Sequence, residues 1–214
     1  MILTCCAILF DLDGVVVDST PAVARVWAKW ARAHALSPEK VIAQAHGRRS
    51  IETIRSVAPH MNAEQEHLRV EQMEIDDKEG VTALPGAAHL LSSLPQDRFA
   101  IVTSATDALA SARMQYAGLP LPLHCICAED VTQGKPSPEP YLKGAELLGL
   151  APHDCVVLED APAGIVSARA AGMQVIALPN TYPADELSGA TAIVNSLVAL
   201  RVHCDDGRLR VETL

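Results

Sequence analysis

Short runs of branched apolar residues recur along the chain, each bounded by polar or turn-forming positions. Runs of this kind are typical of buried strands. They predict strands over residues 5–10, 98–103, 124–127, 155–158, 174–178 and 191–194. From about residue 84 onward the strands alternate with stretches of helical periodicity, which indicates a parallel sheet with helices packed on it. We therefore expect an α/β fold with a doubly wound parallel-sheet core.

The stretch from residue 15 to residue 83 departs from this alternation, because it has helical periodicity and almost no strand signal. Thr20-Pro21 marks a helix start, and a second long helix is predicted from Asn62 to Asp77. One face of the first helix is apolar, at i, i+3, i+4 spacing, through Ala22, Val23, Val26, Trp27, Trp30 and Ala31. We expect the tryptophans to pack inside a small bundle rather than to stack on a ligand. Residues 15–83 are thus predicted to form a helical cap domain, inserted into a core of residues 1–14 and 84–214.

Turn and capping residues define the remaining elements. A helix is expected to open at Thr106-Asp107 and to end near Ala117. Ser137 can cap another helix with Pro138 in its first position, because proline is well suited to a helix start; this helix should end near Leu148. The tail, 201–211, reads as a hairpin around Asp205-Asp206-Gly207, since Asp-Gly favours tight turns.

Composition and charge limit the classes of partner that the protein is expected to bind. The chain has 214 residues, 49% of them hydrophobic, and a net charge of −9. A negative surface disfavours nucleic acid and anionic membranes. The sequence also shows no targeting segment and no run of about 20 apolar residues, so we expect a cytoplasmic protein. Its six cysteines lie mostly in or beside predicted strands and are expected to be reduced thiols, and the Cys125-Ile126-Cys127 spacing argues against zinc.

Carboxylates follow two of the predicted strands. Asp11 and Asp13 come directly after the first strand, with Gly14 behind them, and Glu159-Asp160 follows a later one. Ligands bind outside the carboxyl ends of the strands in an open parallel sheet. Because hard oxygen ligands suit Mg²⁺, these two pairs are candidates to hold a divalent cation together. Each pair could alternatively be an ordinary polar strand end.

Groups suited to an anion follow two other strand ends. Ser104 lies on the turn before the helix at Thr106-Asp107, and free N–H groups at a helix start favour phosphate. Lys135 stands just ahead of the helix at Ser137-Pro138. A hydroxyl and an ammonium beside a bound cation would hold an anionic ligand against it. Taken separately, the serine can be a helix cap and the lysine a solvated loop residue.

Taken in order, these motifs resemble those of the haloacid-dehalogenase-like hydrolases. The resemblance lies in Asp11-Leu12-Asp13-Gly14-Val15, Ser104, Gly134-Lys135-Pro136 and Glu159-Asp160. It covers essentially the whole chain and is closest to the bacterial sugar phosphatases, which lie near the glycerol-phosphate phosphatases. It implies a Rossmann-like core with a cap and a magnesium-dependent phosphatase of small sugar or polyol phosphates. Family members are often monomers, and we expect the same here.

The resemblance also implies roles for the core residues. Asp11 would attack phosphorus and become an aspartyl phosphate, while Asp13 would protonate the leaving oxygen and later activate water. Ser104, Ala105 and Lys135 would contact the phosphoryl group. Magnesium ligands would come from Asp11, the backbone carbonyl of Asp13 and Asp160, with Glu159 either a further ligand or an outer partner.

Two other functions fit the same motifs. A phosphomutase of the β-phosphoglucomutase type is one, and Gly14-Val15-Val16 leans slightly toward it. Those mutases carry a cap histidine ten residues after the second aspartate, where this chain has Val23. The other is a non-catalytic phosphosugar sensor. Carbon–halogen cleavage is not expected, because the dehalogenases lack a carboxylate at the position of Asp13.

Substrate choice is predicted to depend on the break between two cap helices. The segment Ala45-His46-Gly47-Arg48-Arg49-Ser50 resembles the specificity loop of the sugar and glycerol-phosphate phosphatases. Arginine can bind hydroxyls or phosphate with two parallel donors. We expect His46, Arg48 and Arg49 to contact substrate, with Arg49 in the place of the family's arginine. A solvated basic turn is the alternative for this segment.

Overall fold

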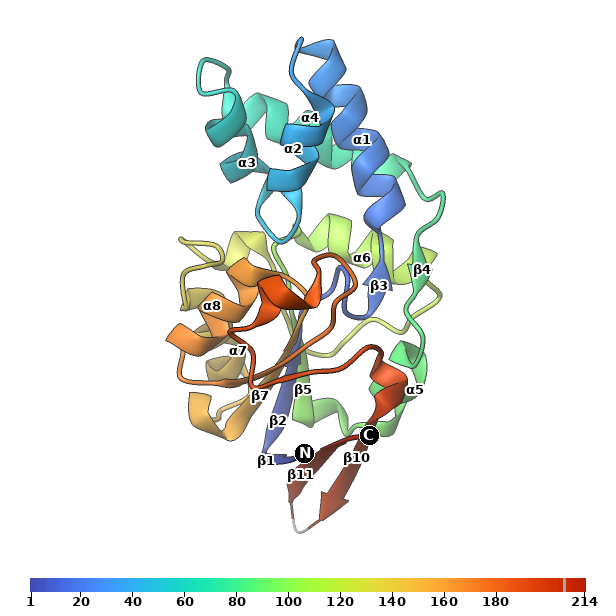
Figure 1. Ribbon diagram of the computed structural model, residues 1–214, viewed down its shortest axis with the longest axis vertical. Helices are drawn as coiled ribbons and strands as arrows, with labels where there is room; N and C mark the ends of the chain where they lie inside the picture. Colours follow the sequence, from blue (N-terminus) through green and yellow to red (C-terminus); the bar gives the residue numbers. More distant parts are fainter. Residues whose placement is uncertain (206) are drawn as a thin grey trace.

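A six-stranded, fully parallel sheet lies at the centre of the protein (Figure 1). The computed structural model describes residues 1–205 and 207–214. From one edge to the other, the strands are β6 (Cys125–Ile126), β5 (Phe99–Val102), β2 (Ala7–Phe10), β7 (Cys155–Glu159), β8 (Gln174–Ala177) and β9 (Ala192–Ile193). The chain winds outward from β2 through β5 to β6, then crosses back to β7 and continues to β9. The predicted doubly wound α/β core is therefore confirmed.

Helices cover both faces of this sheet. Helices α5 (Ala87–Ser93) and α6 (Asp107–Tyr116) share a hydrophobic cluster with one face, and α7 (Glu139–Leu147) and α8 (Pro162–Ala170) share a second cluster with the other. Successive residues of β2 belong to opposite clusters, because side chains alternate across a strand. Since both faces are covered, the central strands are apolar at every position.

Four helices form a separate bundle at the carboxyl edge of the sheet (Figure 1): α1 (Thr20–Ala33), α2 (Pro38–Ala45), α3 (Ser50–Val57) and α4 (Ala63–Asp76). The bundle has its own hydrophobic cluster, in which Trp27 and Trp30 pack edge to face with ring centroids 5.6 Å apart. This confirms the tryptophans as packing residues. Asn62, the first residue of the predicted second helix, is instead the cap of α4, accepting a hydrogen bond from the Gln65 N–H at 3.1 Å.

Two short strands that the sequence did not reveal join the bundle to the core. β3 (Val17–Asp18) and β4 (Thr82–Ala83) pair antiparallel where the chain enters and leaves the helices (Figure 1). Each strand has two residues, so no alternation can be read from either, and their pairing joins segments more than sixty residues apart.

The predicted strand over 5–10 is wrong in one respect, because Cys6 interrupts it and separates β1 from β2. The Cys6 N–H donates to the Asp154 carbonyl at 2.6 Å, and Cys5 belongs to a different sheet. That second sheet is antiparallel and contains β1 (Ile2–Cys5), β11 (Arg208–Thr213) and β10 (Leu200–Asp205). The predicted hairpin in the tail is confirmed by the pairing of β10 with β11; Asp206, predicted in its turn, lies outside the described residues.

Short 3₁₀ helices complete the described chain: η1 (Gln96–Arg98), η2 (Ala128–Asp130), η3 (Pro152–Asp154), η4 (Ala184–Leu187) and η5 (Leu197–Ala199). Helix α7 begins at Glu139, one residue after the predicted start. All six cysteines are among the described residues and are free thiols. In the part of the chain that the structure describes, no helix is both long and apolar enough to span a membrane.

Candidate active site

A cavity of about 190 Å³ lies between the sheet and the helical bundle. Its core wall includes Asp11, Asp13, Gly14, Thr103, Ser104, Ala105, Thr106, Arg113, Asp160 and Thr181. Its cap wall includes Val23, Trp27, His46, Arg48, Arg49, His67, Glu71 and Glu74. The core wall gathers residues that follow β2, β5 and β7, because the carboxyl ends of parallel strands meet at one edge of a sheet.

Lys135 connects the aspartate motif with the glutamate motif behind the core wall. Its Nζ lies 2.9 Å from Asp11 Oδ1 and 2.7 Å from Glu159 Oε1, and it donates to the Val102 carbonyl at 3.1 Å. The side chain is 1% exposed. Burial alone would lower the pKa of Lys135, but the two neighbouring carboxylates raise it overall. Lys135 is therefore a fixed, charged contact for Asp11 rather than a solvated loop residue.

Glu159 is fully buried and its two oxygens are already occupied. Oε1 accepts from Lys135 Nζ and, at 2.9 Å, from the Tyr141 hydroxyl. Oε2 accepts from the backbone N–H groups of Asp160 and Ala161 at 2.8 and 2.9 Å. A Cβ on Gly164 would stand 1.6 Å from Oε1, so only glycine leaves room for this carboxylate. With four donors on its two oxygens, Glu159 fits an outer partner better than a direct metal ligand.

Asp160 approaches the aspartate motif because Gly14 has no side chain. A Cβ on Gly14 would stand 1.8 Å from Asp160 Oδ2 and 2.6 Å from Thr181 Oγ1. Gly14 also has a φ of +75°, which glycine adopts without strain. The Gly14 carbonyl accepts from Asn180 Nδ2 at 2.8 Å, which fixes the turn against the loop after β8.

The buried carboxylates fit a divalent cation. One oxygen each from Asp11, Glu159 and Asp160 lie within 4.8 Å of one another. Lys135 supplies a single positive charge beside these three carboxylates, so a negative excess remains in a buried site. Burial and the neighbouring Glu159 raise the pKa of Asp160, and burial raises that of Asp11 to about 7 against the opposing effect of Lys135. Hard oxygen donors with uncompensated charge are the environment that Mg²⁺ satisfies.

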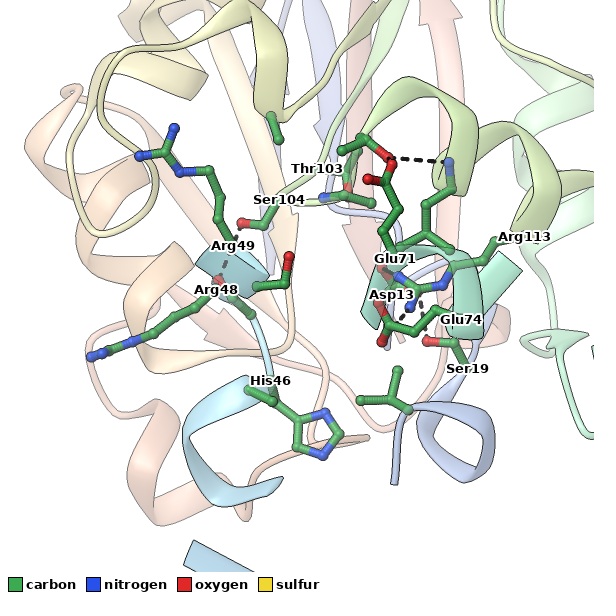
Figure 2. A pocket seen from close by; sticks show the side chains of 18 of the residues that line it. Asp13, Ser19, His46, Arg48, Arg49, Glu71, Glu74, Thr103, Ser104 and Arg113 are labelled. Carbon is green, nitrogen blue, oxygen red and sulfur yellow. Dashed lines mark hydrogen bonds and ion pairs between the residues drawn. The ribbon is translucent and has the colours of Figure 1, made fainter. Parts of the chain in front are cut away.

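Asp13 lies on the side of the cavity toward the bundle, between two donors (Figure 2). The Ser19 hydroxyl donates to Oδ1 at 2.6 Å, and Arg113 Nη1 donates to Oδ2 at 2.5 Å. The other arm of Arg113, Nη2, lies 3.3 Å from Glu74 Oε1 on α4. Asp13 is thus tied both to the start of α1 and, through Arg113, to the last helix of the bundle.

Ser104 lies at the contact between core and bundle. Its hydroxyl donates to the Gly47 carbonyl in the α2–α3 loop at 3.3 Å (Figure 2). The neighbouring Ala105 is buried, with its N–H bonded to Thr103 Oγ1 at 3.1 Å. Thr106 caps α6 by accepting from the Leu109 N–H, and its hydroxyl donates to Glu71 on α4. The turn after β5 therefore supports the bundle as well as the core wall.

The predicted specificity loop meets the core through Arg49. Arg49 pairs with Glu52 and donates to the carbonyls of Val131 and Thr132, both at 3.2 Å. Its Nε would lie 2.8 Å from a Cβ on Gly134, so the arginine passes directly over the glycine before Lys135. Although Arg49 lines the cavity, its donors are directed to core carbonyls. The structure thus reveals a link between cap and core at the place predicted to read the substrate.

The other two loop residues are less restrained. His46 is half-buried, burial lowers its pKa, and its backbone carbonyl accepts from the Tyr182 hydroxyl at 3.5 Å. Arg48 is exposed, and Figure 2 shows its guanidinium directed away from Asp13. Their contact with substrate stays a prediction.

Sequence reasoning missed the residues that α4 and α6 contribute to the site. His67, Glu71 and Glu74 share one face of α4 at i, i+4 and i+7, and all three line the cavity. The spacing was visible, but a polar helix is normally read as solvated. Arg113 also gave a signal, as a lone cation among the small and apolar residues of α6, and it is buried.

Comparison with known proteins agrees with this geometry. The family model described as haloacid dehalogenase-like hydrolase matches residues 7–172. Hexitol phosphatase A of Escherichia coli (strain K12) is 47% identical over 203 residues, covering 92% of this chain and 94% of that protein. Glycerol-1-phosphate phosphohydrolase 2 of Saccharomyces cerevisiae is 37% identical over 211 residues, covering 92% of this chain and 84% of that protein. A hydrolase structure from Pseudomonas syringae superposes with a TM-score of 0.81 at 24% identity, covering 90% of this chain and 94% of that one. This similarity supports the fold. The chain belongs to the haloacid dehalogenase-like hydrolases.

Proposed function

We propose that the protein is a magnesium-dependent phosphatase that hydrolyses phosphate monoesters of small sugars or polyols. The observation that carries the proposal is the buried contact of Lys135 with Asp11, beside the carboxylates of Glu159 and Asp160. Relatives named as hexitol and glycerol-1-phosphate phosphatases support the reaction class and the kind of substrate. The structural similarity adds support for the fold that presents these residues.

In this proposal Asp11 is the nucleophile. It follows β2 directly, with its carboxylate on the cavity and one oxygen held by Lys135, so that the other is available to attack phosphorus. The bond to the leaving oxygen breaks as the aspartyl phosphate forms. Water then attacks that phosphate, releasing inorganic phosphate and restoring the carboxylate.

Asp13 is proposed as the proton donor and acceptor of the two steps. It gives a proton to the oxygen of the departing alcohol, then takes one from the attacking water. Its place two residues after Asp11, on the bundle side of the cavity, lies toward the part of the substrate that leaves. Ser104, Ala105 and Lys135 are proposed to contact the phosphoryl oxygens and to offset the charge that develops there.

Asp11, Asp160 and the backbone carbonyl of Asp13 are the proposed metal ligands, with Glu159 behind them. When bound, Mg²⁺ would neutralise charge and orient the phosphoryl group. Glu159 itself orients Lys135 and the backbone N–H groups of Asp160 and Ala161. Its four hydrogen bonds support a role in holding the site together.

Residues 15–83 are proposed to act as a cap that closes over the non-reacting part of the substrate. The bundle has its own hydrophobic cluster, and its contacts with the core include the polar ones of Arg49 and Ser104. Closing a site in this way excludes water, which strengthens the electrostatic interactions inside it.

The cap wall supports a neutral polyol or sugar with a single phosphate. Glu71 places a carboxylate on the cavity, and Glu74 adds a second one that is paired with Arg113. The guanidiniums of Arg48 and Arg49 point away from Asp13. Carboxylates accept hydrogen bonds from hydroxyl groups. They would also repel a second anionic group on the substrate.

A substrate panel with and without Mg²⁺ tests the proposal. The panel contains sorbitol 6-phosphate, glucose 6-phosphate, glycerol 1-phosphate and fructose 1,6-bisphosphate, and both free phosphate and isomerised sugar phosphate are measured. We expect magnesium-dependent phosphate release from the monophosphates and much slower release from the bisphosphate. Isomerised product without phosphate would instead establish a mutase, and inactivity throughout would favour a phosphosugar sensor.

A further inference from the structure

Both carboxylate oxygens of Asp13 are engaged in the structure. Ser19 Oγ is 2.6 Å from Oδ1 and Arg113 Nη1 is 2.5 Å from Oδ2. A general acid must bring an oxygen within hydrogen-bond reach of the leaving group. For Asp13 to reach a substrate, at least one of these two contacts has to be exchanged for a contact with the substrate.

Of the two partners of Asp13, Arg113 makes the stronger bond because it is charged. It belongs to none of the four sequence motifs. It lies on α6, is 7% exposed, and uses its two terminal nitrogens for two different carboxylates. One carboxylate, Asp13, belongs to the core, and the other, Glu74, belongs to α4 of the bundle. A planar guanidinium can hold two acceptors in a fixed geometry, which a lysine ammonium cannot do.

Glu74 is held by two partners, a side-chain hydrogen bond with Trp27 inside the bundle and the ion pair with Arg113. It is 8% exposed, and burial raises its pKa while the neighbouring Arg113 opposes that rise. The cost of a buried charge without a partner keeps Glu74 and Arg113 together. Because Glu74 moves with α4, the position of the bundle also sets the position of the guanidinium beside Asp13.

We propose that Arg113 is a positioning residue for Asp13, and that Glu74 couples this positioning to the cap. This inference rests on the proposed function and deepens it. Val23, which stands where the resembled mutases have a histidine, is a buried apolar residue on the cavity. The cationic partner of Asp13 is supplied instead by α6. Arg113 holds the Asp13 carboxylate while the cap is in the observed position, and a shift of α4 draws the guanidinium away and frees Oδ2 for the leaving group.

The test separates proton transfer from every other step by changing the leaving group. The panel substrate that the wild type hydrolyses fastest has an alcohol leaving group that needs a proton, whereas p-nitrophenyl phosphate releases a stable phenolate without one. The value of kcat/KM reports binding and the first phosphoryl transfer, which is the step that Asp13 assists as an acid. It is measured for both substrates with the wild type, Arg113→Lys and Glu74→Gln.

We expect Arg113→Lys to lose about tenfold or more in kcat/KM on the alcohol substrate, as part of what general acid catalysis supplies. Its loss on p-nitrophenyl phosphate should stay within about threefold. Glu74→Gln keeps an oxygen beside Arg113 but removes the charge, so we expect a smaller loss of the same selective kind.

Glu66→Gln is the matched control, because Glu66 is another buried carboxylate of α4. It accepts from Trp30 Nε1 at 2.9 Å and faces the interior of the bundle instead of Asp13. We expect it to affect the two substrates equally. If Arg113→Lys and Glu74→Gln also lower both substrates in the same proportion, their role is structural and the inference is overturned. A wild type inactive on every phosphate ester would refute the proposed function itself, which is a different result.

Discussion

The core wall and the cap wall of the cavity are built in different ways. Behind the core wall, Lys135 and Glu159 are almost completely buried, and their polar atoms bond to backbone groups, to each other and to the buried side chains of Asp11 and Tyr141. On the cap wall, His67 and Glu71 are half-buried and bond mainly to other side chains, such as Ser50 and Thr106. The core wall therefore has a charge pattern that is fixed before any substrate arrives, whereas the cap wall can change without disturbing the sheet.

This difference suggests a division of labour. A pre-organised set of charges is what phosphoryl transfer requires, because a displacement of about 1 Å can cost about a hundredfold in rate. Selection among small sugars and polyols needs only different hydroxyl partners, which side chains on a helix face can supply. Changes in the core wall should therefore act on turnover, and changes in the cap wall, apart from Glu74 with its link to Asp13, on affinity.

The largest effect is expected from Asp11→Asn. The amide keeps the shape of the side chain but is a poor nucleophile, so we expect turnover to fall by about 10⁴-fold or more with thermal unfolding little changed. Phosphate release from the best panel substrate and circular dichroism measure the two. Asp18→Asn is the control, since Asp18 lies seven residues further on and outside the cavity. Turnover retained in Asp11→Asn would rule out the covalent route.

Gly164→Ala tests whether the core wall tolerates a small displacement. The new Cβ would stand 1.6 Å from Glu159 Oε1, so either the carboxylate or α8 must shift. We expect the free energy of unfolding to fall by about 1–3 kcal/mol. We also expect kcat to fall about tenfold or more, because Lys135 loses its orientation.

Gly189→Ala provides the comparison for that substitution. Its Cβ would meet only Ile165 Cγ2, at 3.3 Å, far from the carboxylates. Gly164→Ala and Gly189→Ala should differ clearly from each other, both in denaturant unfolding and in steady-state kinetics. Equal effects would mean that packing near α8, and not Glu159, limits activity.

The smallest effect is expected from Arg49→Ala in the cap wall. Because Arg49 bonds to the carbonyls of Val131 and Thr132, its loss should loosen the docking of the α2–α3 loop. We expect KM to rise by about threefold to tenfold for polyol phosphates and p-nitrophenyl phosphate alike, and stability to fall by at most about 1 kcal/mol, as for other partly exposed pairs.

Arg55→Ala is the control for Arg49, since Arg55 lies on α3, the helix that Arg49 precedes, and pairs with Glu64 in an exposed position. Its kinetics should match the wild type. If Arg49→Ala raises KM for polyol phosphates far more than for p-nitrophenyl phosphate, Arg49 reads the substrate directly, as the sequence motif predicts.

The amino-acid sequence by itself determined the strands of the parallel sheet, the ends of α4, α6 and α7 to within one residue, and the alternation that requires a parallel sheet. These features are local, because periodicity, caps and turns are encoded within a few neighbouring residues. It also placed Asp11, Ser104, Lys135 and Asp160 after strands, and parallel strands bring such positions to one edge whatever their separation in the chain.

Only the tertiary structure decided which groups share a hydrogen bond. The placement of β1 in a second sheet, the bonds of Glu159 with Lys135 and Tyr141 and the contact of Arg113 with Asp13 all join separate segments of the sequence. The sequence likewise gave no sign that Arg49 donates to the carbonyls of Val131 and Thr132. Such contacts depend on the angle and distance at which helices dock on the sheet, and no periodicity within a single segment carries that information.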